Sequence, residues 1–175
     1  MLEFKKPSNI QAISIPLIVA EPHHDLIAQA RNGCGKTGSF TIGSALRVDR
    51  DLPADKVQIL VIANTRELVN QIHSVYEKIV RSTGITLENT NDVRKPAQIL
   101  VTTHGKLLSM LEKRPTLDLS HLKCIVVDEA DVFFLDDKNF QALQTVAKNK
   151  EIIGRPDDNR VQWILFSATY PEGTE

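Results

Sequence analysis

The most regular feature of the chain is a series of short apolar runs that do not alternate with polar residues. Such runs are typical of parallel strands that are buried on both faces of a sheet. Proline, glycine, asparagine and aspartate cluster between them and indicate loops. The strands that this pattern predicts are Asp25–Ala30, Val57–Ala63, Gln98–Thr102, Cys124–Asp128 and Gln162–Ser167.

Between the predicted strands, apolar residues recur at spacings of three and four, which indicates amphipathic helices. The clearest cases are Lys36–Val48 and Thr65–Arg81, the second with Leu68, Ile72 and Ile79 on one face. Because strands and helices alternate along the chain, we predict an α/β fold: a parallel sheet with helices on both faces. In such sheets, ligands bind beyond the carboxyl ends of the strands.

A further helix is predicted near the amino end. Ser8 is a favourable N-cap residue, and Ile10, Ile13 and Leu17 would form the apolar stripe that faces the core. Pro16 has no backbone N–H to donate, so it is expected to kink this helix or to end it early.

Length and composition favour one globular domain, because 175 residues that are 42% apolar can bury a sizeable core. The net charge of −1 limits any contact with RNA or DNA to a local patch. No apolar run is long enough to span a bilayer and no secretory leader is evident, so we expect an intracellular protein without a membrane span. Cys34 and Cys124 suggest neither a disulfide framework nor a zinc site.

The glycine-rich stretch Gln29–Phe40 fits two different phosphate-binding motifs. Its three glycines have the spacing G-x-G-x-x-G of a dinucleotide-binding loop, whereas Gly35-Lys36-Thr37 is the end of a P-loop. A dinucleotide site requires an acid at the end of the next strand, where this chain has Ile62-Ala63-Asn64. The P-loop is therefore favoured, and a Rossmann dehydrogenase is the alternative.

A P-loop also requires an acid at the end of another strand, and Asp128 and Glu129 follow an apolar strand directly. Lys36 would reach the β and γ phosphate oxygens, and Thr37 and Asp128 would hold Mg²⁺, partly through water. Glu129 would orient or deprotonate the attacking water. The predicted catalytic residues are thus Glu129, Asp128 and Lys36.

Asp128-Glu129-Ala130-Asp131 spells DEAD, and other short motifs stand around it in a fixed order. These are Phe4–Gln11 (Q motif), Ala30–Thr37 (motif I), Asn64–Leu68 (motif Ia), Thr102–Lys106 (motif Ib) and Ser167–Thr169 (motif III). With this set, the chain resembles the amino-terminal half of DEAD-box RNA helicases over nearly its whole length.

The resemblance implies that residues 1–175 form an amino-terminal RecA-like ATP-binding domain and that the carboxy-terminal RecA-like domain is absent from this chain. It implies ATP or ADP with Mg²⁺ as ligands, and ATP hydrolysis coupled to RNA binding and remodelling. RNA bound through its backbone, the second RecA-like domain of the full-length protein and regulatory proteins would be the partners. Without the second domain and its arginine finger, this chain alone is expected to hydrolyse ATP weakly or not at all.

The resemblance also assigns further site residues. Gln11 and Phe4 would contact the edge and the face of adenine. The nucleotide-binding set is Phe4, Gln11, Ala30, Arg31, Asn32, Gly33, Cys34, Gly35, Lys36 and Thr37. Residues that would couple the nucleotide state to the partner domain are Asp131, Ser167 and Thr169. Residues that would contact RNA are Thr65, Arg66, Thr103, Gly105 and Lys106.

Some positions depart from the usual family pattern. Thr103-His104-Gly105-Lys106 stands where T-P-G-R is common, and Leu87–Asp92 replaces a glycine pair that helps to hold RNA. This departure, with Lys113–Leu119, is similar to the nuclear-pore mRNA-export branch and would place the protein in the cytoplasm or nucleus, including the nuclear envelope. The alternatives are the translation initiation factor 4A branch and a nucleotide-sensing module without hydrolysis.

Overall fold

The computed structural model describes residues 6–90, 96–112 and 117–169. Its centre is a six-stranded sheet in the order β1-β6-β5-β2-β4-β3, in which all neighbours are parallel. The strands are β1 (Leu26–Gln29), β2 (Ile59–Ala63), β3 (Leu87–Asn89), β4 (Ile99–Thr103), β5 (Cys124–Asp128) and β6 (Gln162–Ser167). All five predicted strands are confirmed, two with the same bounds, whereas the edge strand β3 was not predicted.

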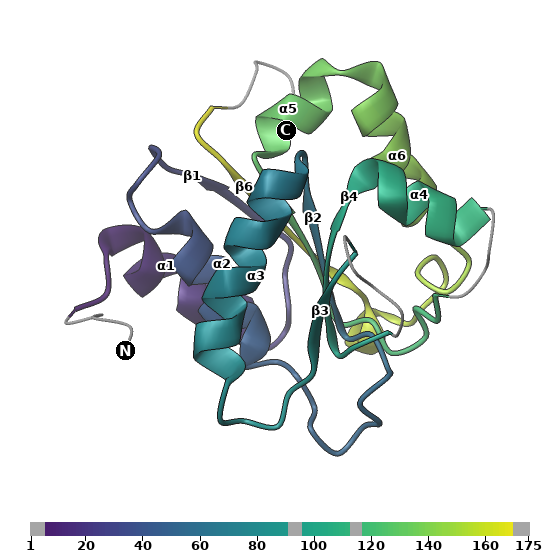
Figure 1. Ribbon diagram of the computed structural model, residues 1–175, viewed down its shortest axis with the longest axis horizontal. Helices are drawn as coiled ribbons and strands as arrows, with labels where there is room; N and C mark the ends of the chain where they lie inside the picture. Colours follow the sequence, from purple (N-terminus) through teal and green to yellow (C-terminus); the bar gives the residue numbers. More distant parts are fainter. Residues whose placement is uncertain (1–5, 91–95, 113–116, 170–175) are drawn as a thin grey trace.

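Helices cover both faces of the sheet (Figure 1). One face carries α1 (Asn9–Val19), α2 (Lys36–Ala45) and α3 (Arg66–Val80), and the other carries α4 (His104–Glu112), α5 (Ala130–Leu135) and α6 (Asp137–Ala147). A short 3₁₀ turn, Asp157–Asn159, precedes β6. The predicted α/β fold with helices on both faces is therefore confirmed, and α2 is shorter than predicted.

Each face of the sheet has its own hydrophobic core. Ile59 and Val61 of β2 pack toward the α1–α3 side, whereas Leu60 and Ile62 of the same strand belong to the α4–α6 side. All four side chains are fully buried. Burial on both faces explains why the strand reads as an unbroken apolar run, because no position of β2 faces water.

The face of α1 that contacts the core differs from the prediction. Ile13 and Leu17 are 63% and 51% exposed, and the buried positions are Gln11, Ser14 and Ile18. Two of these three are polar. They can be buried because the Ser14 hydroxyl donates to the Ile10 carbonyl and the Gln11 amide bonds to neighbouring backbone. Hydrogen bonding thus allows polar residues to be buried on the face of α1 that contacts the core.

Pro16 neither ends nor shortens α1, which continues to Val19. The chain resumes backbone bonding after the proline, since the amide of Ala20 donates to the Pro16 carbonyl at 2.8 Å. The expectation of an early end was therefore wrong.

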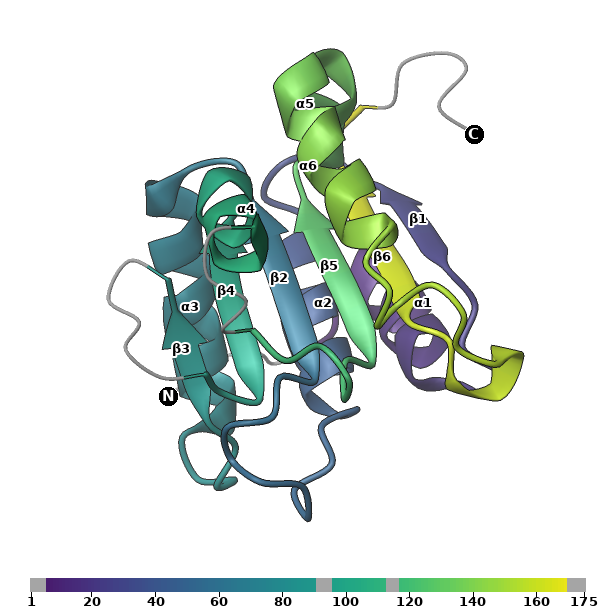
Figure 2. The same ribbon diagram turned by 90° about the vertical axis from the view of Figure 1, so that its right-hand side faces the viewer.

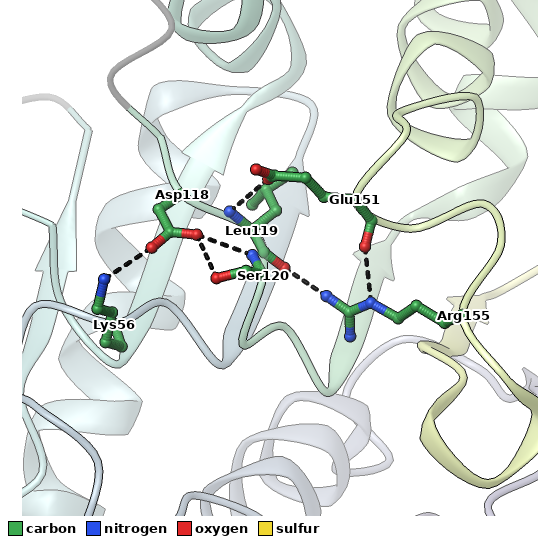
Figure 3. A network of polar contacts seen from close by, with 6 residues as sticks. All are labelled: Lys56, Asp118, Leu119, Ser120, Glu151 and Arg155. Atoms are coloured by element: carbon green, nitrogen blue, oxygen red, sulfur yellow. Dashed lines mark hydrogen bonds and ion pairs between the residues drawn. The ribbon is translucent and has the colours of Figure 1, made fainter.

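A polar network fixes the loops at the amino ends of the strands (Figure 3). Lys56, just before β2, donates to Asp118 at 2.8 Å, and the backbone amide of Leu119 donates to Glu151 at 2.8 Å. Arg155 then donates to the backbone carbonyls of Glu151 and Leu119 at 2.6 and 2.5 Å. These bonds hold together the three loops that precede β2, β5 and β6, at the amino ends of the strands.

Candidate nucleotide site

The register of the sheet brings three predicted motifs together at the carboxyl ends of neighbouring strands. Gln29 of β1 pairs with Ser167 of β6, and Phe166 pairs with Asp128 of β5, so these strands end side by side. The sheet is seen face-on in Figure 2. The backbone amide of Ala30 donates to the Ser167 carbonyl at 3.0 Å. The start of motif I is therefore bonded directly to motif III.

The loop between β1 and α2 has the backbone geometry that exposes N–H groups to an anion. Gly33 and Gly35 have positive φ angles of 78° and 100°, which side chains disfavour. Helix α2 begins at Lys36, so unpaired amides and the positive end of the helix dipole lie at this loop. Arg31, Asn32 and Gly33 are exposed on it, and Cys34 is half-buried.

Lys36 is held within the loop rather than projecting into solvent. Its side chain is buried, and Nζ donates to the Ala30 carbonyl and to Asn32 Oδ1, both at 2.9 Å. These bonds use two of the three N–H donors of the ammonium group. Asn32 thus positions the lysine, a role that the family resemblance did not specify.

Gln11 joins the first helix to the loop. Its Oε1 accepts from the Ser8 amide at 3.0 Å, and its Nε2 donates to the Gly35 carbonyl at 3.2 Å. A side-chain amide has two N–H donors and two acceptor positions, so half of its capacity remains for a base edge. Phe4, the predicted adenine-stacking residue, lies outside the described residues.

Asp128 and Glu129 occupy a strained and poorly solvated turn. Burial is the largest effect on the pKa of Asp128 and, together with the Glu129 carboxylate, raises it to about 6 against a hydrogen bond from the Glu129 amide. Glu129 has φ 53° and ψ 48°, a left-handed conformation that is costly for a residue with a side chain. Such strain and a perturbed pKa are typical of functional sites.

These groups surround one cavity of about 300 Å³. Its lining residues are Asn32, Gly33, Gly35, Lys36, Thr37, Leu68, Asp128 and Glu129. Leu68 was predicted as the last residue of motif Ia and as part of an apolar helix face, but not as a nucleotide-site residue. No local signal marks it as a cavity residue, because it reaches the cavity only through the position of α3 beside the loop.

The donor set fits Mg²⁺ bound together with phosphates. Within the described ranges, no three His, Cys, Asp or Glu side chains form a group that could hold a metal ion alone. Mg²⁺ usually binds one or two protein oxygens plus substrate phosphates and water. Thr37 and Asp128, which line the same cavity, would be the protein ligands.

Asp131 connects α5 to motif III. Thr169 Oγ1 donates to Asp131 Oδ2 at 2.9 Å, and the Ser167 hydroxyl donates to the Thr169 carbonyl at 2.6 Å. Burial would raise the pKa of Asp131, but the neighbouring hydroxyls of Ser167 and Thr169 outweigh it and lower the pKa. The three predicted coupling residues therefore form one hydrogen-bonded group.

The residues predicted to contact RNA follow two neighbouring strands. Ala63 of β2 pairs with Thr103 of β4, so the segments that begin α3 and α4 leave the sheet next to each other. Arg66 and Lys106 are exposed there. Thr65 is the N-cap of α3 and accepts a hydrogen bond from the Leu68 amide at 3.2 Å. The structure groups these residues at the carboxyl edge, beside the nucleotide cavity.

The structure also shows the surroundings of four residues that belong to none of the motifs. Cys124 is fully buried, and burial raises its pKa to about 12. His23 and His24 lie in the loop before β1 and join no metal-binding group in the described ranges. Trp163 packs against the α4–α6 core.

Across 6–90, 96–112 and 117–169, no helix is both long and apolar enough to cross a membrane.

The chain matches a known protein family over most of its length. Residues 8–175 match the family described as DEAD/DEAH box helicase. The chain is 41% identical over 184 aligned positions to "DEAD-box ATP-dependent RNA helicase 38" of Arabidopsis thaliana, an alignment that covers 98% of this chain and 36% of the relative. The chain thus spans about a third of the length of this relative.

Solved structures agree with this match. The chain is similar to S. cerevisiae Dbp5 bound to RNA and ADP BeF3, with a TM-score of 0.84 and 31% identity over 97% of this chain and 42% of that chain. A second structure of yeast Dbp5, in a complex that includes Nup159 and Gle1, has a TM-score of 0.84 and 30% identity over 97% of this chain and 44% of that chain. The fold is the RecA-like helicase domain that these structures contain.

Proposed function

Because the chain belongs to the DEAD/DEAH box helicase family, we propose that it is the ATP-binding half of an ATP-dependent RNA helicase of the mRNA-export branch. One observation carries this proposal: Lys36, Thr37, Asp128 and Glu129, which are distant in sequence, line the same cavity. Such a set binds a magnesium nucleotide and activates water. The dinucleotide alternative has no comparable support, because the half-buried residue after β2 is Asn64 rather than an acid.

The chemistry follows from these positions. Loop amides and the Lys36 ammonium bind the phosphates, and Thr37 and Asp128 hold Mg²⁺. The metal supplies charge neutralisation at the phosphate oxygens when it is bound. Glu129 orients the attacking water and accepts its proton. Gln11, tied to the loop through Gly35, selects adenine.

RNA lies across the exposed starts of α3 and α4, where Arg66 and Lys106 contact phosphates without reading sequence. The group formed by Asp131, Ser167 and Thr169 passes the nucleotide state to a second RecA-like domain, which supplies the arginine finger. Regulatory proteins control this cycle of ATP binding, RNA binding and ATP hydrolysis. The protein acts in the cytoplasm or nucleus, including the nuclear envelope.

Titration of the chain with ADP and Mg²⁺ tests the nucleotide site. Lys36→Ala should weaken ADP binding by about tenfold or more, because charge-assisted hydrogen bonds to phosphate are lost. Lys78→Ala, an exposed lysine on α3, is the matched control and should bind like the parent. Equal affinity of Lys36→Ala and the parent would contradict the proposal, and preferential binding of NAD would favour the dinucleotide alternative.

A further inference from the structure

A second and larger cavity lies at the amino ends of the strands, opposite the nucleotide cavity. It has a volume of about 980 Å³, and we call it the base cavity. Its walls come from the end of α1, the loop 21–24 before β1, the end of α2, Lys123 before β5 and the turn 157–160 before β6. These elements lie at the lower ends of β1 and β6 in Figure 2, away from the P-loop. None of the helicase motifs contributes to it.

Two cations of the base cavity have no carboxylate partner. Arg47 and Lys123 are half-buried, and neither forms an ion pair with any residue in the described ranges. Arg47 donates to the side-chain oxygen of Gln162, and Lys123 Nζ donates to the Arg47 carbonyl at 3.2 Å. The guanidinium still has donors available, because it carries five N–H groups in a planar fork.

His23 adds a third basic group on the same wall. Its Nδ1 atom is buried and has no hydrogen-bond partner among the described residues. Burial is the main cause that lowers the pKa of His23, followed by the positive charge of Arg47; Lys123 acts in the same direction. Glu21, 3.9 Å from His23 Nε2, and the backbone of Ala20 raise it. Burial and the two neighbouring cations thus both disfavour the imidazolium form of His23, and the same cations would attract an anion.

The acidic groups of the cavity are on its rim. The Glu21 side chain is 86% exposed and Asp157 is exposed. Arg160 is already paired with Asp25. Val19, Pro22 and Leu46 complete the wall with apolar surface. The interior is therefore positive and partly apolar, and its volume is typical of sites for small molecules.

We propose that the base cavity binds a small phosphate-bearing molecule, whose phosphate is held by Arg47, Lys123 and His23. A phosphate suits this set because the planar fork of arginine matches its oxygens, lysine adds positive charge and the imidazole adds an N–H donor. The apolar wall would contact the body of the molecule. The site is separate from the proposed nucleotide site and does not depend on it.

Pyrophosphate titration followed by NMR tests this proposal, because each site has its own reporter. Ring signals of His23, assigned with His23→Gln, report on the base cavity, and the amides of Gly33 and Gly35 report on the P-loop. Pyrophosphate should shift the His23 signals and raise the His23 pKa, since a nearby anion favours the imidazolium. ADP with Mg²⁺, which should fill the P-loop, should leave this response in place.

Variants separate the proposed contacts from general effects. Arg47→Gln and Lys123→Gln should each raise the pyrophosphate concentration that is needed for the His23 response by about ten- to a hundredfold. Lys123→Gln keeps the measurement possible if loss of the Arg47 bond to Gln162 impairs folding. Arg81→Gln, which removes an exposed arginine outside the cavity, is the control and should respond like the parent.

Three results would overturn the proposal. These are His23 signals that do not move, His23 signals that move equally in the parent and in both cavity variants, and a response to an oligoglutamate peptide without one to pyrophosphate. The last result would indicate an acidic peptide as the partner. Glycine amides that shift while His23 does not would support the nucleotide site and still refute the base cavity.

Discussion

Replacing Asp128 by asparagine should stabilise the chain while removing its metal-binding charge. Asp128 is 6% exposed, and the pKa of its side chain is raised from 3.8 to about 6, mainly by burial. Between these values the folded state binds more protons than the unfolded state, so the free energy of unfolding falls as the pH rises and the loss is complete above the folded pKa. About two pKa units at 1.36 kcal/mol each correspond to a cost of about 3 kcal/mol at neutral pH.

Asparagine has nearly the same shape and keeps an oxygen to accept from the Glu129 amide, but it carries no charge. Its NH₂ group needs a partner in return, so we expect Asp128→Asn to gain about 1–3 kcal/mol over the parent near pH 8. The gain should be roughly 1.4 kcal/mol smaller near pH 5, where the folded parent is mostly protonated. Urea unfolding at both pH values, in chelator and without nucleotide, measures the difference.

Asp118→Asn is the control with the opposite sign. Hydrogen bonds from Lys56, then Ser120, lower the pKa of Asp118, so this carboxylate contributes stability above its ordinary pKa and loses it only at acid pH. Because the pair is partly exposed, Asp118→Asn should lose at most about 1 kcal/mol, equally near pH 5 and pH 8. The reasoning on Asp128 would be refuted if Asp128→Asn were no more stable than the parent near pH 8, or if its gain did not change with pH.

Three further predictions concern the loop and the chain as a whole. Cys34, which is half-buried, should react with an alkylating reagent far faster than the fully buried Cys124, and bound ADP should protect it; equal labelling rates would contradict the loop geometry. Gly35→Ala should lose about 1–3 kcal/mol in urea unfolding and bind ADP poorly, because a Cβ there lies 2.7 Å from Gln11 Nε2 at a φ of 100°, whereas Gly84→Ala, also at positive φ but in open space, should keep ADP affinity. Residues 1–175 alone should show little RNA-stimulated ATPase activity, since an arginine finger contributes about 10³–10⁵ in rate; strong turnover by this chain would show that the proposed division between two domains is wrong.

The sequence by itself determined the parallel sheet and the positions of the main motifs. Cys124–Asp128 and Gln162–Ser167 were predicted with their observed bounds, because strands buried on both faces leave unbroken apolar runs. Lys36, Asp128 and Glu129 were recognisable because phosphate and metal chemistry requires these residue types at fixed places after a strand. Such local requirements can be read without knowing the packing.

Only the tertiary structure decided which polar groups are buried. Gln11 is buried and donates a hydrogen bond to Gly35, a residue 24 positions away, whereas the apolar Ile13 is exposed. The short strand β3 (Leu87–Asn89) exists because it pairs with β4, and its half-buried polar residues give no periodic signal. Arg155 is held by carbonyls of loops far away in sequence. Each of these depends on a partner brought near by folding, so no spacing within its own segment could have specified it.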